Sequence, residues 1–251
     1  SIVQRIVLGA KARRVDFETY VDWQEQIKLL KVRFNTTVNS RYATYDLPFG
    51  NIERPTTRNN SYEAAKFEVP GHLWMDISQA DYGLSLLNDC KYGHEAFGKM
   101  IGLTLLKGPT FPDPVSDLGD HWFTYSLYPH TKCWREGQTH REALDLNNRA
   151  EVVLTDSKAG DLPAAHSFIT IEGNGVALET VKKAEDSDDL IVRIVERHGG
   201  QTDVAVRFAS TITKVSECNL LERDDDPVDH TAEGFDFVIK PYEIRSFKIS
   251  I

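Results

Sequence analysis

The chain is poor in cysteine and has no long apolar segment. Its three cysteines, Cys90, Cys133 and Cys218, are odd in number and widely separated, and no two of them form a Cys-x-x-Cys pair. This pattern excludes a disulfide framework and is typical of a reducing, intracellular setting. No apolar run approaches the ~20 residues of a membrane-spanning helix, and no basic segment followed by an apolar one opens the chain. The sequence therefore predicts a cytoplasmic protein without a membrane partner.

The chain is also short of positive charge. It carries 29 Lys and Arg against 38 Asp and Glu among 251 residues, which gives a formal net charge of −9. A nucleic-acid partner requires clustered Lys and Arg for its phosphates, so the composition argues against nucleic acid. A neutral ligand such as a sugar is compatible with it. With 41% hydrophobic residues, the chain has enough apolar material for a substantial core.

Sustained helical spacing is a third absence, and period-two alternation takes its place. One face of residues 15–23 carries Val15, Phe17, Thr19, Val21 and Trp23. Comparable runs recur between segments rich in Gly, Pro, Asn and Asp, while residues 142–148 indicate one short helical turn at most. We therefore predict an all-β chain of antiparallel sheets packed face to face, with Trp23 in the core and fewer than about a tenth of the residues in helices.

A small, polar, proline-containing segment divides the chain at residues 155–165, and we interpret it as a linker. It separates one β-domain over residues 1–154 from a second over residues 166–251. The second domain, with about seven short strands, is typical of a small immunoglobulin-like β-sandwich. Because the chain opens in the middle of an alternating run, and not in loose polar residues, we expect a fragment of a longer protein.

The segment from Gly83 to Gly93 carries the strongest functional pattern. Leu84 and Leu86 fall on one face of a predicted strand, which then breaks into a polar cluster. A rigid strand that ends in an amide, a carboxylate and an ammonium presents polar groups at the rim of a cleft. The alternative is a structural turn, in which the carboxylate and the ammonium pair, since Asn, Asp and Gly favour turns whatever their function. The candidate ligand-binding residues are Asn88, Asp89, Lys91 and Tyr92.

The same segment resembles the LLNDCKYG motif in the C-terminal region of family 38 glycoside hydrolases, the retaining α-mannosidases, in their bacterial and cytosolic-type branch. The resemblance covers most of residues 1–150 and, more loosely, the remainder. Further matching segments follow in the family's order at residues 14–23, 29–32, 48–56, 65–70, 112–114 and 121–130.

This resemblance implies a fold, and it implies that the catalytic residues lie in another domain of the protein. The C-terminal half of these mannosidases is similar to a galactose-mutarotase-like super-sandwich followed by small β-sandwiches, so the chain would carry the later part of the super-sandwich and the last sandwich. The family hydrolyses terminal α-mannosides with retention, and its nucleophile also binds a divalent metal, usually zinc, in an upstream catalytic domain. No catalytic residue, metal site or cofactor is therefore expected in this chain. Its expected partners are that catalytic domain and a mannose-containing oligosaccharide, and a homo-oligomer is left open.

The resemblance also adds candidate site residues. Glu53 and Arg54 lie in one of the recurrent family segments and are candidates to face the catalytic cleft; the alternative is a structural loop with a local ion pair. In better-known branches, an arginine that reaches the substrate lies in a comparable Asp-Arg segment. Lys91 occupies the matching position, with the charge but without bidentate reach. Independently of the resemblance, Trp134, beside Arg135 and Glu136 in a predicted loop, is the candidate for stacking on a sugar.

Three functions remain open from the sequence. The chain is expected to complete the active-site cleft of an α-mannosidase. The alternatives are an independent, non-catalytic carbohydrate-binding β-domain and a purely structural module. A catalytic domain with metal-binding His and Asp residues upstream of residue 1 would decide for the first.

Overall fold

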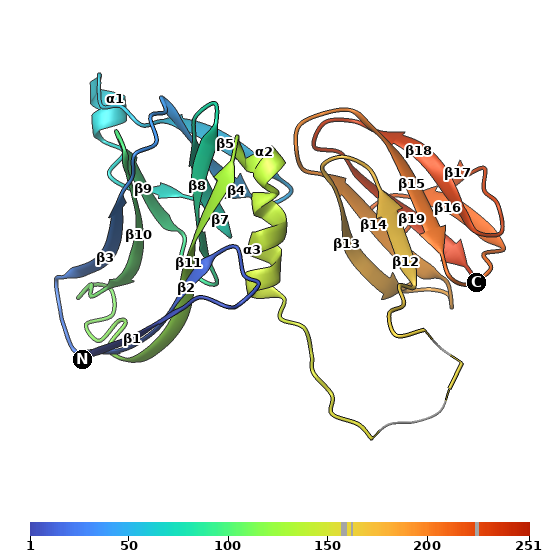
Figure 1. Ribbon diagram of the computed structural model, residues 1–251, viewed down its shortest axis with the longest axis horizontal. Coiled ribbons are helices and arrows are strands. Elements are labelled where there is room, and N and C mark those ends of the chain that lie inside the picture. Colours follow the sequence, from blue (N-terminus) through green and yellow to red (C-terminus); the bar gives the residue numbers. More distant parts are fainter. Residues whose placement is uncertain (157–159, 162, 224–225) are drawn as a thin grey trace. The chain divides into compact units, whose positions relative to one another are not determined.

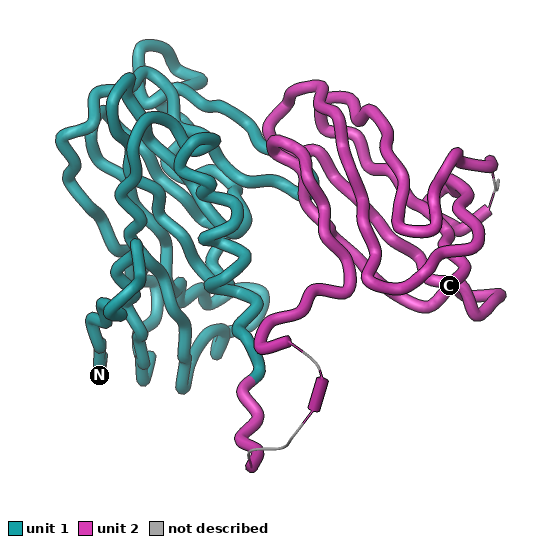
Figure 2. The backbone as a smooth tube through the Cα atoms, turned by 45° about the vertical axis from the view of Figure 1, so that its right-hand side comes forward, with its two compact units in different colours: residues 1–151 teal, residues 152–251 magenta. Residues whose placement is uncertain are grey.

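The computed structural model describes residues 1–156, 160–161, 163–223 and 226–251. The chain forms two compact units, Ser1–Glu151 and Val152–Ile251 (Figure 2). The predicted linker at residues 155–165 falls after this division, and its residues 157–159 and 162 lie outside the described part. Strands account for 49% and helices for 7% of the structure, which confirms the all-β prediction. None of the described helices is long and apolar enough to cross a membrane.

Unit 1 contains two antiparallel sheets (Figure 1). The seven-stranded sheet has the order β1-β2-β11-β8-β7-β4-β5, and the four-stranded sheet has the order β3-β10-β9-β6. The strands of the first sheet are β1 (Ile2–Val7), β2 (Val15–Trp23), β4 (Tyr42–Leu47), β5 (Gly50–Pro55), β7 (Trp74–Ser78), β8 (Tyr82–Asn88) and β11 (Gly119–Thr131). Those of the second are β3 (Leu29–Asn35), β6 (Val69–Pro70), β9 (Gly93–Phe97) and β10 (Met100–Lys107).

The alternation seen in the sequence places the core of unit 1 between these sheets. On β2, Val21 and Trp23 are buried, while Asp22 between them points to the other face. Trp23 is therefore a core residue, as predicted. Leu86 of β8 joins the same cluster, packed against the inner face of the four-stranded sheet. That sheet contributes Ile101, Leu103, Leu105 and Leu106.

Three helices complete unit 1: α1 (Ser61–Ala64), α2 (Trp134–Gly137) and α3 (Thr139–Asn147). The second and third pack on the outer face of the seven-stranded sheet through a separate apolar cluster. Its buried members are Trp74, Leu87, Tyr128, Trp134, Ala143 and Leu146. Two predictions were wrong here. Residues 142–147 belong to a nine-residue helix and not to a single turn, with Asn148 as its C-cap. Trp134 is only 2% exposed, so its ring cannot stack on a sugar from solvent.

Unit 2 is a β-sandwich of a three-stranded sheet, β12-β15-β18, and a five-stranded sheet, β13-β14-β19-β16-β17. Its core includes Val192, Ile194, Val206, Phe235 and Phe247. The predicted C-terminal sandwich is confirmed. Its strands are β12 (Ile169–Glu172), β13 (Val176–Lys183), β14 (Leu190–Glu196), β15 (Thr202–Phe208), β16 (Lys214–Cys218), β17 (Asp226–Pro227), β18 (Gly234–Ile239) and β19 (Ile244–Ser250).

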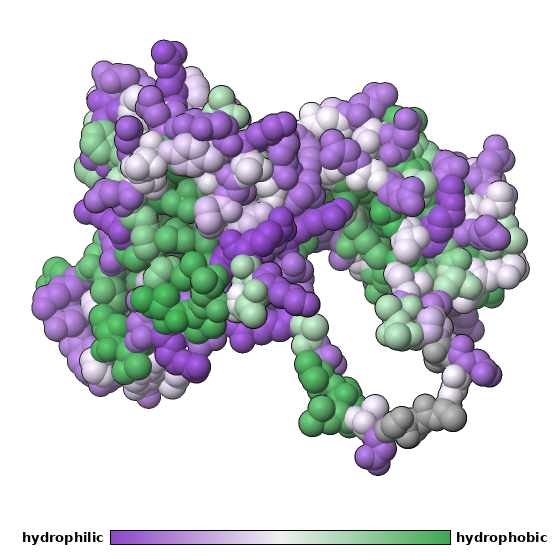
Figure 3. Space-filling view, viewed as in Figure 1, coloured by the Kyte–Doolittle hydropathy of each residue, from purple (hydrophilic) through white to green (hydrophobic). Residues whose placement is uncertain are grey.

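Some apolar side chains remain at the surface. Figure 3 shows them near the N-terminal strand β1 and on the segment that follows α3. β1 is an edge strand, so its side chains lack a neighbour on one side. The exposed apolar residues of these two places are Ile2, Val3, Ile6, Leu8, Val152, Val153 and Leu154.

Candidate functional site

The polar cluster predicted from the sequence forms the turn between β8 and β9, residues 88–93. The antiparallel ladder of β8 with β11 runs up to the pair Asn88 and Tyr125. Leu86 is buried in the core between the sheets and Leu87 under the helices, so β8 is held on both faces. A strand held in this way fixes the position of the turn that follows it.

Asn88 closes this turn from the inside. Its side chain is 1% exposed; its Oδ1 accepts the main-chain N–H of Lys91 at 2.6 Å, and its Nδ2 donates to the carbonyl oxygen of His72 at 2.9 Å. The amide is thus occupied by partners within the protein. The structure gives Asn88 an internal role, which differs from the ligand-facing role expected from the sequence.

Asp89 extends the contact between the turn and β11. Its main-chain N–H donates to the carbonyl oxygen of Thr124 at 3.1 Å, and its Oδ2 accepts the N–H of Thr124 at 2.8 Å. No ion pair joins Asp89 to Lys91 among the described residues. The turn is therefore closed by main-chain contacts of Asn88 and Asp89, and not by the pairing of opposite charges that the alternative reading required.

Lys91 and Tyr92 are the side chains that the turn presents. The Lys91 Nζ lies 4.4 Å from the centroid of the Phe123 ring, a cation–π contact that restricts where the ammonium can go. Tyr92 is 57% exposed, and its ring meets that of His72 edge-on at 5.4 Å. With the exposed Asp89, the turn offers an ammonium, a carboxylate and a phenol. These groups can donate to and accept from sugar hydroxyls.

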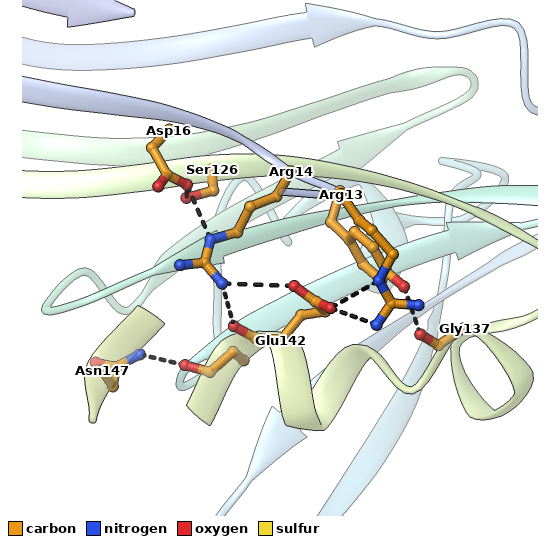
Figure 4. A network of polar contacts seen from close by, with 9 residues as sticks. Arg13, Arg14, Asp16, Ser126, Gly137, Glu142 and Asn147 are labelled. Carbon is orange, nitrogen blue, oxygen red and sulfur yellow. Dashed lines mark hydrogen bonds and ion pairs between the residues drawn. The ribbon is translucent and has the colours of Figure 1, made fainter. Parts of the chain in front are cut away.

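Helix α3 contacts the end of β8 through Asn147, which Figure 4 shows on the helix. The Nδ2 of Asn147 donates to the carbonyl oxygen of Asn88 at 3.1 Å and to that of Ala143 at 2.8 Å. One side chain therefore joins the last turn of the helix to the end of β8. Movement of α3 would shift the β8–β9 turn with it.

The helix is itself held by an ion-pair network around Glu142 (Figure 4). Arg13 donates through Nε to Glu142 Oε1 at 3.0 Å, and Arg14 donates through Nη1 to the Glu142 carbonyl oxygen at 3.2 Å. Arg14 Nε also donates to Asp16 Oδ1 at 2.9 Å, and that oxygen accepts from Ser126 Oγ at 2.6 Å. The carboxylate of Glu142 raises the pKa of the Arg13 guanidinium. The network links the start of β2 to α3 and β11.

The structure separates Glu53 from Arg54, the other two predicted site residues. Neighbouring residues of a strand point to opposite faces, so no ion pair forms between these two described residues. Glu53 is exposed, whereas the guanidinium of Arg54 lies over the ring of Tyr45, 4.7 Å from its centroid, and its Nη1 is buried without a hydrogen-bond partner. Burial lowers the pKa of Arg54 and raises the pKa of Tyr45 to about 12. No hydrogen bond or ion pair among the described residues joins Arg54 to the β8–β9 turn.

One buried polar group beneath α3 has no recognisable signal in the sequence. His130 Nε2 lies 2.7 Å from Asp76 Oδ2 and 3.1 Å from Ser85 Oγ, and Ser85 also contacts Thr139 Oγ1 at 2.8 Å. A serine, a histidine and an aspartate meet here, but a single ring nitrogen contacts both partners, and the side chains of Asp76 and His130 are each 2% exposed. This is not the relay of a nucleophilic triad, in which the two ring nitrogens have different partners. The group satisfies buried polar atoms below the helix.

Comparison with known proteins agrees with this architecture. A crystal structure of an alpha-mannosidase from Enterococcus faecalis V583 matches 98% of this chain with a TM-score of 0.80 at 18% sequence identity, and 28% of that chain is covered. Residues 1–115 match the family model "Glycosyl hydrolases family 38 C-terminal domain". Residues 175–247 match "Glycosyl hydrolases family 38 C-terminal beta sandwich domain". The fold and these matches define the class: the C-terminal β-region of a glycosyl hydrolase.

Curated relatives identify the glycosyl hydrolase family more closely. Alpha-mannosidase G of Dictyostelium discoideum is 40% identical over 99% of this chain, and alpha-mannosidase 2C1 of Homo sapiens is 40% identical over 90% of it. The chain belongs to glycosyl hydrolase family 38, as part of its C-terminal region. It spans 23% and 22% of the length of these two relatives.

Proposed function

We propose that this chain is the C-terminal, cleft-completing β-region of an α-mannosidase that hydrolyses terminal α-mannosides with retention. The single observation that supports the proposal most strongly is the 40% identity to alpha-mannosidase G over 99% of the chain. Because that relative is about four times longer, the remaining three quarters would supply the catalytic domain. The predicted partners are this upstream domain and a mannose-containing oligosaccharide.

The chemistry of cleavage is assigned to the rest of the protein. Among the described residues, no group of three or more His, Cys, Asp and Glu side chains could hold a metal ion. The residues present therefore do not fit the divalent metal that the family implies. A zinc ion and the nucleophile that binds it are proposed for the upstream domain alone.

The contribution of this chain would be the β8–β9 turn. Lys91, restrained over Phe123, and Asp89, bonded to the main chain of Thr124, present fixed charges of opposite sign. A fixed ammonium can donate to sugar hydroxyls without a large loss of side-chain entropy on binding. The turn would thus orient the mannoside and exclude water at one wall of the cleft.

Replacing Lys91 by Met in the full-length enzyme tests this role. Lys91→Met retains the length of the side chain but removes its charge, so kcat/KM should fall by about tenfold or more while the melting temperature stays the same. Lys99→Met, at an exposed lysine, is the matched control and should keep normal kinetics. Unchanged kinetics in Lys91→Met would reject a substrate-facing turn, and loss of stability alone would leave it a structural turn.

A further inference from the structure

A groove on the outer face of the seven-stranded sheet is not used by the proposed function. Across β1, β2 and β11, Val3 pairs with Tyr20 and Tyr20 with Trp122; in the next row Arg5 pairs with Glu18. These side chains therefore lie on one face of three adjacent strands. With Arg149, which follows α3, they line a groove of about 350 Å³, called here the Trp122 groove.

Trp122 is the aromatic surface of this groove. Its side chain is 70% exposed, whereas Trp23, Trp74 and Trp134 are 7%, 2% and 2% exposed. The ring of Tyr20 lies beside it, with a centroid distance of 5.0 Å and an angle of 38° between the ring planes. The Tyr20 hydroxyl donates to Asp120 Oδ1 at 2.7 Å, which fixes the phenol ring. The indole is thus held by a neighbour and open to solvent on its free side.

Polar groups of both kinds flank the indole. Arg5 Nη1 and Glu18 Oε2 are 3.5 Å apart, and their side chains remain 77% and 38% exposed, so both retain capacity for further hydrogen bonds. Arg149 adds a second exposed guanidinium. A carboxylate accepts from two hydroxyls, and a guanidinium donates through its planar fork. An apolar floor with donors and acceptors at its rim matches a sugar ring, which has an apolar face and hydroxyls around its edge.

We propose that the Trp122 groove is a binding site for a hexopyranose unit of a glycan, which stacks on the indole of Trp122 and bonds through its hydroxyls to Arg5, Glu18 and Arg149. The mixed charge of the rim disfavours a polyanion, and the three polar side chains disfavour an apolar helix, because each would lose its solvent contacts without new partners. This site goes beyond the cleft-completing role, since it requires only residues of this chain.

Nuclear magnetic resonance of the 251-residue chain tests the proposal directly. The four tryptophans give four indole N–H signals, and Trp122→Phe identifies that of Trp122. Titration with methyl α-mannoside or methyl α-glucoside should shift the Trp122 signal saturably, with a Kd of about 1 mM. The three buried tryptophans are internal controls and should not shift. The proposal would be overturned if neither sugar shifts the Trp122 signal saturably.

Matched variants separate this site from general surface effects. Trp122→Ala should weaken binding by about tenfold or more, and Glu18→Gln by about fivefold. Tyr62→Ala, at another aromatic residue that is 83% exposed, should leave binding unchanged. Equal affinity of wild type and Trp122→Ala would also overturn the proposal.

The full-length protein gives the second test. Trp122→Cys and Tyr62→Cys should react with a maleimide at similar rates, and excess methyl α-mannoside should slow only the former. If Trp122→Cys reacts much more slowly than Tyr62→Cys even without sugar, another part of the protein covers the groove. This result would overturn the proposal. A negative result here leaves the Lys91→Met test of the proposed function unaffected. That test changes a different residue and measures kcat/KM, not binding of sugar to the Trp122 groove.

Discussion

The side-chain oxygen of Asn88 lies 2.6 Å from the main-chain nitrogen of Lys91 and accepts its hydrogen bond. The same side chain donates to the carbonyl oxygen of His72. A buried amide therefore sets the path of the chain just before the one ammonium that the turn presents. The position of Lys91 depends on Asn88, although Asn88 itself is not open to a ligand.

Asn88→Ala should lower the free energy of unfolding by about 2 kcal/mol, because two hydrogen bonds are lost and their main-chain partners are left without a side-chain partner. Urea unfolding followed by fluorescence measures this change. Asn39→Ala, at an exposed asparagine, is the control and should be neutral. Equal midpoints for Asn88→Ala and wild type would show that the turn is held without the amide.

Glu142→Gln tests the network that holds α3. The side chains of Glu142 and Arg14 are only 11% and 17% exposed, and removal of the carboxylate takes away one of the two carboxylate partners of Arg14, which keeps its ion pair with Asp16. We expect a loss of about 2 kcal/mol, below the full cost for a buried pair because Arg13 remains 62% exposed. Asp188→Asn breaks the exposed pair with Lys183 and should cost much less. Similar losses in the two variants would contradict the importance assigned to burial.

The buried imidazole of His94 should make stability depend on pH. Burial lowers the pKa of His94 to about 4 from its ordinary value of 6.5. The unfolded chain therefore binds a proton between pH 6.5 and 4 that the folded chain does not, so stability is retained above pH 6.5 and falls as the pH drops through this window. The expected loss is on the order of 3 kcal/mol.

The difference between wild type and His94→Gln isolates this effect, because all other titrating groups are shared. The free energy of unfolding should fall more steeply for wild type between pH 7 and pH 5, as measured by urea titration at each pH. The Gln variant is expected to be less stable throughout, so only the slopes are compared. Parallel slopes would mean that His94 takes up its proton at the same pH in the folded and the unfolded chain.

The strands were predictable from the sequence because their signal is local. Leu86 lies in the core and Leu87 under the helices, as a period of two requires. Helix α3 was underestimated for an equally physical reason. Its N-cap, Gln138, has φ 56° and makes no side-chain cap, and the buried polar residues His140 and Glu142 interrupt the apolar spacing.

The site could be predicted only in part. The position of Lys91, Asp89 and Tyr92 in one turn follows from their adjacency in the sequence. The bond between Arg14 and Glu142 spans 128 residues, and no periodicity carries information about such a pairing. The burial of Trp134 could not be predicted either, because it depends on a contact that is distant in the sequence. The ring centroids of Trp134 and Trp74 are 5.0 Å apart.

Glu196 should be as important to unit 2 as Asn88 is to unit 1. Its side chain is fully buried and accepts three main-chain N–H groups, from His198 at 2.7 Å, Gly199 at 2.8 Å and Tyr242 at 2.9 Å. Gly199 has φ 77°, a conformation that glycine adopts without strain. The carboxylate of Glu196 joins the turn at Gly199 to the turn at Tyr242, which precedes β19.

Glu196→Gln replaces one accepting oxygen by an NH₂ group that opposes a main-chain N–H, and it removes the charge that strengthens all three bonds. The free energy of unfolding should fall by about 2 kcal/mol or more. Asp186→Asn, at an exposed carboxylate of the same unit, is the control and should be neutral. Hydrogen exchange adds a local measurement: the amides of His198, Gly199 and Tyr242 should exchange faster in Glu196→Gln. Unchanged exchange at all three would show that the carboxylate does not hold these turns together.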